Sequence, residues 1–265
     1  MFCFYLWAAA QVILESFPIS SSGHVALLSF ACPPDAAFPT FVYVHEYIGY
    51  VLHLPTAIIV AIFFAPRWSF PFLHIKRCWK LVLKISWYAA LATIVTLIGY
   101  GLSIAQGGAL KMGMPLPVSF FITACCLWSL RWCENDTCEK LDSLKVIILG
   151  AVQALAFVPG ISRFAITYVV ARWMRLPARR AFEVSFLIQW PLIMCAALYS
   201  AYVLYRPSIE LLNLPFVLVM LGASIMAYAG LCIVSYMVKK RIMWWWGFYM
   251  LIPLALSIML GVMNA

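Results

Sequence analysis

Long apolar stretches constrain this chain more than any other feature of its sequence. Several approach the roughly 20 residues that an α-helix needs to cross the hydrocarbon core of a bilayer. Of the 265 residues, 66% are hydrophobic and only 10% are charged, whereas soluble domains contain about 25% charged residues. A soluble fold of this size could not bury so much apolar surface. The sequence therefore predicts an all-α integral membrane protein.

The apolar stretches fall into two kinds. Six predict full crossings, at about 45–66, 86–104, 115–131, 182–204, 213–237 and 243–262. Two more, 1–31 and 146–171, are each interrupted near the middle by a proline and small polar residues. The nine cysteines are scattered, and because most lie in apolar runs, we expect them to be small core residues.

The basic residues predict the sidedness of the crossings. The net charge is +9, but the Lys and Arg residues lie between apolar stretches, which favours a role in topology and not nucleic-acid binding. Five lie in 67–84, three in 131–145, four in 172–180 and three in 239–241. Because cytoplasmic loops are enriched in Lys and Arg, we place these four segments on the cytoplasmic side.

This sidedness makes both interrupted segments re-entrant. Segment 146–171 has basic residues on both flanks and is too short to cross twice as helix, so it must enter and return from the cytoplasmic side. Segment 1–31 has no Lys or Arg and should enter and return from the outer side. Irregular backbone at membrane depth is tolerated only against protein or a water-filled cavity. Two opposed hairpins therefore predict a shared polar cavity.

The sequence also indicates an internal duplication. Residues 11–21 resemble 153–162, with a glutamine followed by a proline and serine, and 52–55 parallels 188–191 at nearly the same separation. We therefore expect six transmembrane helices plus two re-entrant helical hairpins in inverted-topology repeats, an architecture that places sites near the midplane. The alternative is two unrelated Pro-kinked helices. The expected repeats, within one membrane domain, are about 1–131 and about 144–265.

The first hairpin carries a polar cluster at its break. Gln11 and Glu15 share a helix face because they are four residues apart, and Glu15 is an ionisable group inside an apolar stretch, which is usually functional. Small residues at a helix start leave N–H groups free to bind an anion. The alternative is that Ser20 only caps a helix and that Glu15 snorkels toward the membrane surface. The cluster comprises Gln11, Glu15, Ser20, Ser21, Ser22, Gly23 and His24.

The second hairpin carries the basic counterpart, made of Gly160, Ser162 and Arg163, with Gln153 before it and Thr167 after it. The guanidinium of Arg163 stays charged and presents a planar donor fork suited to phosphate. A structural ion pair with Glu15 is the alternative.

Together the two clusters supply hydroxyls, a carboxylate, an imidazole and a guanidinium. That set can bind a diphosphate, provide a nucleophile or base, and stabilise transferring charge. It lacks the ligand spacing of a zinc site, although Glu15 could hold a metal together with substrate oxygens. His53 and Gln189 could line the same cavity, and a packing role is at least as reasonable for both.

Both segments resemble the signature motifs of the bacterial undecaprenyl-diphosphate phosphatase family, also called bacitracin-resistance proteins. The matching runs are Glu15-Ser16-Phe17-Pro18-Ile19-Ser20-Ser21-Ser22-Gly23-His24 and Pro159-Gly160-Ile161-Ser162-Arg163-Phe164-Ala165-Ile166-Thr167. The resemblance extends over nearly the whole chain. It implies hydrolysis of undecaprenyl diphosphate to the monophosphate in the bacterial inner membrane, at a site facing outward. It also implies a divalent cation, Mg or Ca, bridged to the substrate.

By position, the resemblance carries functional roles onto Glu15, Ser21, His24 and Arg163, and phosphate contacts onto Ser162 and Thr167. Either Ser21 or His24 could be the nucleophile, and His24 could instead be the base. The expected partners are the polyprenyl diphosphate lipid and the bilayer, without nucleic acid, and a homodimer is left open.

Three positions depart from the family pattern. Gln11 replaces a glutamate, so it can form hydrogen bonds but cannot act as a base, while Phe164 and Ala165 replace Ser-Gly beside the arginine. The departures keep two alternatives open. One is a transporter or flippase of the polyprenyl phosphate carrier, and the other is a diverged inactive homologue.

Overall fold

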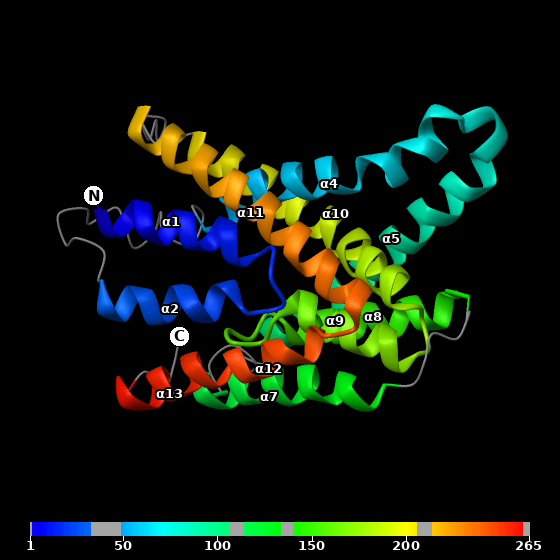
Figure 1. Cartoon of the computed structure of the whole chain (residues 1–265). Helices are drawn as coiled ribbons and strands as arrows, with labels where there is room; N and C mark the ends of the chain where they lie inside the picture. The colour runs from blue at the N-terminus through cyan, green and yellow to red at the C-terminus, as the bar shows by residue number, and fades with distance from the viewer. Residues whose placement is uncertain (1, 33–48, 106–113, 134–139, 206–213, 262–265) are drawn as a thin grey trace.

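The computed structural model describes residues 2–32, 49–105, 114–133, 140–205 and 214–261. All secondary structure in these residues is helical (Figure 1). The helices, in chain order, are α1 (Phe2–Leu14), α2 (Ser21–Ala31), α4 (His53–Leu73), α5 (Ile75–Ala105), α7 (Leu116–Ser129), η1 (Leu130–Trp132), α8 (Ser143–Leu155), α9 (Arg163–Trp173), α10 (Ala178–Tyr205), α11 (Leu214–Lys240), η2 (Met243–Trp245), α12 (Trp246–Tyr249) and α13 (Leu251–Met259).

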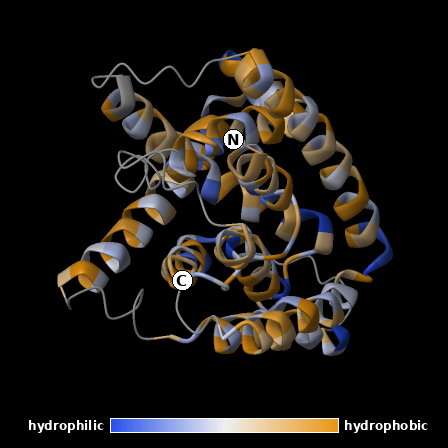
Figure 2. Ribbon diagram, turned by 90° about the vertical axis from the view of Figure 1, so that its left-hand side faces the viewer, coloured by the Kyte–Doolittle hydropathy of each residue, from blue (hydrophilic) through white to orange (hydrophobic). Residues whose placement is uncertain are grey.

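Four helical spans in the described residues are long and apolar enough to cross a membrane, as expected for a multi-pass membrane protein. They are Gly49–Leu73, Ile75–Ala105, Ala178–Val203 and Leu214–Lys240. The hydropathy colouring of Figure 2 shows apolar residues along much of the helical surface. Large side chains on α5, including Ile94 and Ile98, are more than half exposed. Lipid chains are as apolar as leucine, so these exposed faces suit a bilayer.

The two remaining predicted crossings differ in extent from the structure. Segments 115–131 and 243–262 correspond to the shorter apolar helices Leu116–Trp132 and Met243–Met259. α5 also begins earlier than the predicted 86–104, because Lys and Leu are good helix formers and its basic first turns continue the helix beyond the apolar stretch.

Each interrupted apolar segment forms two short helices. α1 and α2 contain 13 and 11 residues, and α8 and α9 also contain 13 and 11. At 1.5 Å per residue these helices are about 16–20 Å long, shorter than a hydrocarbon core of about 30 Å. Ser20 caps α2 by accepting from the Gly23 N–H at 3.2 Å, and Ser162 caps α9 by accepting from the Ala165 N–H at 3.2 Å. The breaks were thus correctly located from the proline and serine residues.

A disulfide joins Cys3 near the start of α1 to Cys32 just after α2, and the sequence analysis did not anticipate it. The expectation that most cysteines are core residues was wrong. Cys125, Cys195 and Cys232 are exposed, because an apolar run in a membrane protein can face lipid as readily as it faces other helices.

The breaks of the two interrupted segments lie against each other. The Gly160 N–H donates to Ser20 Oγ at 3.0 Å, and Thr123 Oγ1 on α7 donates to the Gly160 carbonyl at 2.9 Å. A Cβ added to Gly23 would lie 2.8 Å from the Gly160 Cα. Gly160 itself has φ +93°, a conformation that favours glycine. The close approach therefore depends on both glycines.

An aromatic cluster packs behind the start of α9. The ring of Phe164 lies 4.7 Å from that of Phe186 and 5.6 Å from that of Phe182, and Phe64 contacts the same two rings. All four side chains are at most 2% exposed. This packing holds the first turn of α9, and with it Arg163, against α10, whose two rings also contact Phe64 on α4.

Candidate functional site

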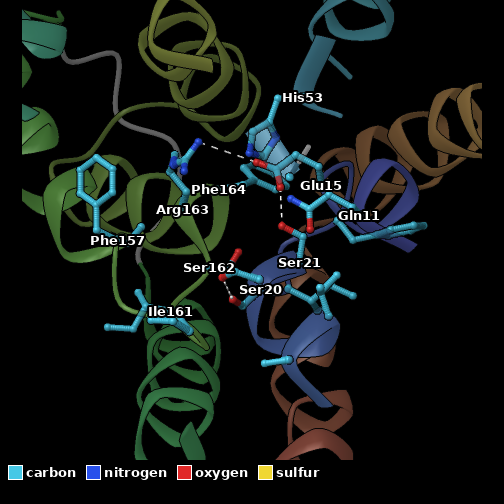
Figure 3. Close-up of a pocket in the computed structure, with 18 of the residues that line it drawn as sticks. Gln11, Glu15, Ser20, Ser21, His53, Phe157, Ile161, Ser162, Arg163 and Phe164 are labelled. Carbon is cyan, nitrogen blue, oxygen red and sulfur yellow. Dashed lines mark hydrogen bonds and ion pairs between the residues drawn. The ribbon is translucent and has the colours of Figure 1, made fainter. Parts of the chain in front are cut away.

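A cavity of about 670 Å³ lies where α1, α2 and the start of α4 meet the 156–164 segment. Figure 3 shows its polar side chains converging from both interrupted segments. Its polar and ionisable wall consists of Gln11, Glu15, Ser20, Ser21, Ser22, Ser29, Tyr50, His53, Ser162 and Arg163. The predicted contact between the two hairpin breaks therefore does bring polar groups from both segments to one cavity.

Glu15 links the two segments electrostatically. Arg163 Nη1 lies 3.8 Å from Glu15 Oε1, and the Ser21 hydroxyl donates to Glu15 Oε2 at 2.5 Å. The side chains of Arg163 and Glu15 are 18% and 11% exposed. The ion pair between Arg163 and Glu15, which the sequence left as an alternative to phosphate binding, is therefore present. Because 3.8 Å exceeds an ordinary N–H···O distance of about 2.7–3.2 Å, the pair leaves guanidinium donors available to a ligand.

Two helix N-termini contribute to the cavity wall. Ser21 and Ser22 form the first turn of α2, and Arg163 and Phe164 the first turn of α9. First-turn N–H groups have no intrahelical partner, and the positive end of the helix dipole favours anions. An anionic group in this cavity would therefore meet two helix dipoles and a guanidinium.

The remaining predicted site residues divide by position. Gln11, Ser20 and Ser162 line the cavity, whereas five others do not. Thr167 donates its hydroxyl to the Arg163 carbonyl at 2.8 Å, and the Gln153 side chain donates to Thr96 Oγ1 at 3.3 Å. The predicted site residues outside the cavity wall are Gly23, His24, Gln153, Gly160 and Thr167.

His24 is not among the residues that line the cavity, so the expectation that it and Arg163 share a pocket is not met. Its Nδ1 lies 2.6 Å from the Ser20 carbonyl oxygen, its Nε2 lies 3.2 Å from Tyr249 Oη, and its ring stacks on that of Tyr249. Successive residues of a helix point about 100° apart. With Ser21, Ser22 and the residues one turn later facing the cavity, His24 falls on the opposite side of α2.

His53 lines the cavity instead, from the first turn of α4. From the sequence, a cavity-lining role and a packing role were equally open for His53. Aromatic side chains that the sequence did not predict to lie here form much of the apolar wall. They are Trp7, Phe17, Phe30, Tyr50, Phe157 and Phe164.

The bulk of Phe164 is largely accommodated outside the cavity. Although it contributes to the wall, its ring is 2% exposed and packs into the aromatic cluster with Phe182 and Phe186. Ala165 is fully buried in the core cluster that contains Phe120. Phe164 and Ala165, in place of the family Ser-Gly pair, therefore change the packing of the protein core next to Arg163 more than they change the volume of the cavity.

The donor set suits a metal only with the help of a ligand. Among the described residues no group of three His, Cys, Asp or Glu side chains is placed to hold an ion. Glu15 is the cavity's carboxylate, and both its oxygens already have partners. Mg²⁺ is commonly bound by one or two carboxylates plus substrate phosphates. Among the described residues there is thus no preformed metal cage, and a cation here would need further oxygen ligands from a bound molecule.

The sequence is similar to those of known proteins. The family model described as "Bacitracin resistance protein BacA" matches residues 5–256. An undecaprenyl-diphosphatase of Thermotoga petrophila is 27% identical over 256 residues, covering 95% of this chain and 97% of that protein. Proteins of the same description from Oceanobacillus iheyensis and Mycobacterium avium are each 27% identical, covering 86% and 75% of this chain and 85% and 77% of their own lengths.

Proposed function

We propose that this chain, which belongs to the bacitracin resistance protein BacA family, hydrolyses undecaprenyl diphosphate or a similar polyprenyl diphosphate to the monophosphate and inorganic phosphate. Relatives described as undecaprenyl-diphosphatases support this substrate class. In a bacterial inner membrane the reaction would recycle the lipid carrier of cell-envelope synthesis.

The observation that carries the proposal is the meeting of Arg163, Glu15 and Ser21 in one cavity. Guanidinium groups bind phosphate through parallel charge-assisted hydrogen bonds. The aromatic wall beside these polar groups suits an isoprenoid chain. We assign diphosphate binding to Arg163 and Ser162, with further contacts from Ser20 and Ser22.

The geometry favours Ser21 over His24 as the nucleophile. Ser21 donates its hydroxyl proton to Glu15 Oε2, which is the arrangement of an activated nucleophile and its base. Ser21 Oγ would attack the terminal phosphorus as its proton passes to Glu15. The bond from that phosphorus to the bridging oxygen breaks, and the prenyl monophosphate leaves. Water then hydrolyses the phosphoserine, releasing inorganic phosphate. Arg163 stabilises the charge on the transferring phosphoryl group in both steps.

We also propose a substrate-bridged divalent cation, Mg or Ca. Glu15 would be its carboxylate ligand and the Gln11 carbonyl a neutral oxygen ligand, with diphosphate oxygens completing the shell. When bound, the cation would neutralise charge on the diphosphate. Phosphate release measured with and without a chelator, and then with added Mg²⁺ or Ca²⁺, tests this assignment.

For topology we propose six crossings and two opposed re-entrant hairpins in inverted repeats, with the cavity open to the outer face. The matching lengths and serine caps of α1–α2 and α8–α9 support the repeat. The Cys3–Cys32 disulfide, at the free ends of α1 and α2, supports an outer location, because disulfides persist in oxidising compartments. In Figure 1 these ends lie on the left, opposite the α4–α5 connection that precedes the basic start of α5.

The decisive experiment separates hydrolysis from transport. Purified protein is reconstituted in proteoliposomes, and both phosphate release and translocation of the prenyl phosphate are measured for wild type and Glu15→Gln. We expect wild type to release phosphate, and Glu15→Gln to do so about 10²-fold or more slowly, because the base is lost. Glu183→Gln, which removes a carboxylate outside the cavity paired with Arg67, is the matched control and should retain activity.

Translocation without phosphate release would favour the flippase alternative, for which Gln11 in place of a catalytic acid is the supporting observation. A wild-type protein that neither hydrolyses nor translocates prenyl phosphates, with either divalent cation, would indicate the diverged inactive homologue.

A further inference from the structure

His53 is a buried imidazole inside the candidate site to which the mechanism above gives no role. It is the first residue of α4, is 7% exposed, and belongs to the cavity wall. In Figure 3 its ring lies beside the carboxylate of Glu15, at the place where Glu15 faces Arg163. It therefore borders the groups that we expect to meet the diphosphate.

The ring lacks a hydrogen bond that its burial would normally require. Among the described residues, His53 Nδ1 is buried and has no hydrogen-bond partner. Among the described residues, its ring contacts that of Tyr50, which is 6.4 Å away between centroids and tilted, an aromatic contact and not a hydrogen bond. Buried polar groups in native proteins are nearly always paired, and an exception calls for a ligand, an ion or a water molecule.

The charge of the cavity gives a second, independent reason. In the described wall, Arg163 contributes one positive charge and Glu15 one negative charge. These two charges cancel, whereas a diphosphate brings several negative charges. A ring N–H of His53 would give that ligand a further hydrogen-bond donor beside the guanidinium of Arg163.

We propose that His53 binds the diphosphate, with a ring N–H donating a hydrogen bond to a phosphate oxygen beside Arg163. This inference rests on the proposed function, because it takes the diphosphate as the ligand of the cavity. It assigns to α4 a direct part in substrate binding. His24, bonded to Tyr249 on the other side of α2, does not take this part.

The test measures binding of a probe that cannot be hydrolysed, the methylene-bridged diphosphonate analogue of farnesyl diphosphate. Its dissociation constant is determined by titration calorimetry for purified wild type, His53→Phe and His53→Gln. Phenylalanine keeps a planar ring and removes both nitrogens, while glutamine keeps a hydrogen-bond donor. We expect His53→Phe to weaken binding at least about tenfold, as for loss of a hydrogen bond to a charged group. We expect His53→Gln to stay within about threefold of wild type.

Thr56→Val is the matched control. Thr56 lies one turn later on α4, is 1% exposed, and its hydroxyl also lacks a partner among the described residues, but it is outside the cavity wall. Binding should not change in this variant. If His53→Phe does not yield folded protein, His53→Ala with and without added imidazole replaces it. Binding should then weaken at least about tenfold and recover with imidazole.

A role for the ring in packing alone predicts the reverse order, with His53→Phe close to wild type and His53→Gln impaired. That order, or equal losses in the two variants, would overturn the proposal. So would an unchanged affinity in His53→Phe, or, in the replacement test, an alanine variant that imidazole does not rescue. Phosphate release from farnesyl diphosphate is assayed in parallel. A wild-type protein that binds the analogue through His53 but releases no phosphate contradicts the hydrolase and leaves the assignment of His53 intact.

Discussion

Ser20→Gly probes the contact that joins the two interrupted segments. The Ser20 hydroxyl accepts from the Gly23 N–H as the cap of α2 and from the Gly160 N–H across the contact. Glycine is a tolerable N-cap, so loss of the capping bond should cost only a few tenths of a kcal/mol. The Gly160 N–H, in contrast, is left buried without its partner, which costs about 1–3 kcal/mol. We therefore expect Ser20→Gly to lower the free energy of unfolding by about 2 kcal/mol.

Ser162→Gly provides the matched comparison, because the Ser162 hydroxyl caps α9 through Ala165 in the same way and, among the described residues, makes no corresponding bond to the other segment. It should cost only a few tenths of a kcal/mol. Both variants are measured without ligand by equilibrium unfolding in mixed detergent–SDS micelles. Equal losses in the two variants would refute the reasoning, because they would show that the Ser20–Gly160 hydrogen bond contributes nothing beyond the cap.

Three further changes should have measurable effects. Gly160→Ala should lower the free energy of unfolding by about 2–5 kcal/mol in the same assay, since φ is +93° and the new Cβ would lie 2.5 Å from Ser119 Cβ; stability like that of wild type would contradict this backbone. Cys3→Ser should cost roughly 3–4 kcal/mol by the chain-entropy relation for a separation of 29 residues, and an unfolding curve insensitive to reductant would argue against the disulfide. Arg163→Lys should reduce phosphate release by about tenfold or more, because an ammonium lacks the planar donor fork, and full activity would exclude bidentate binding.

The helix breaks and their contact could be predicted because the same short pattern of residues occurs at both breaks. A proline followed by serines interrupts each apolar segment, and Ser20 and Ser162 do cap the next helix. The position of basic residues then suggested that the two breaks face each other. The hydrogen bond from the Gly160 N–H to Ser20 agrees with that part of the prediction.

The rotation of each helix about its axis could not be obtained in the same way. His24 and Ser21 are close in sequence, but helix geometry directs them to different sides of α2, and only packing against α7 and α12 shows which side faces the cavity. The position of His53 in the cavity wall could not be predicted either, because a single polar residue in an apolar run is equally compatible with a packing role. The Cys3–Cys32 disulfide, in contrast, could have been predicted, because a hairpin over 1–31 brings its two ends together.

The contact between Gly23 and Gly160 also limits how the protein can move. With no room for even a methyl group between them, the two interrupted segments meet backbone to backbone, so sliding one past the other would break this contact. Under the proposed function, a lipid headgroup would enter the cavity past its aromatic wall, which includes Trp7, Phe30 and Tyr50. We then expect the contact between the two segments to stay in place during turnover.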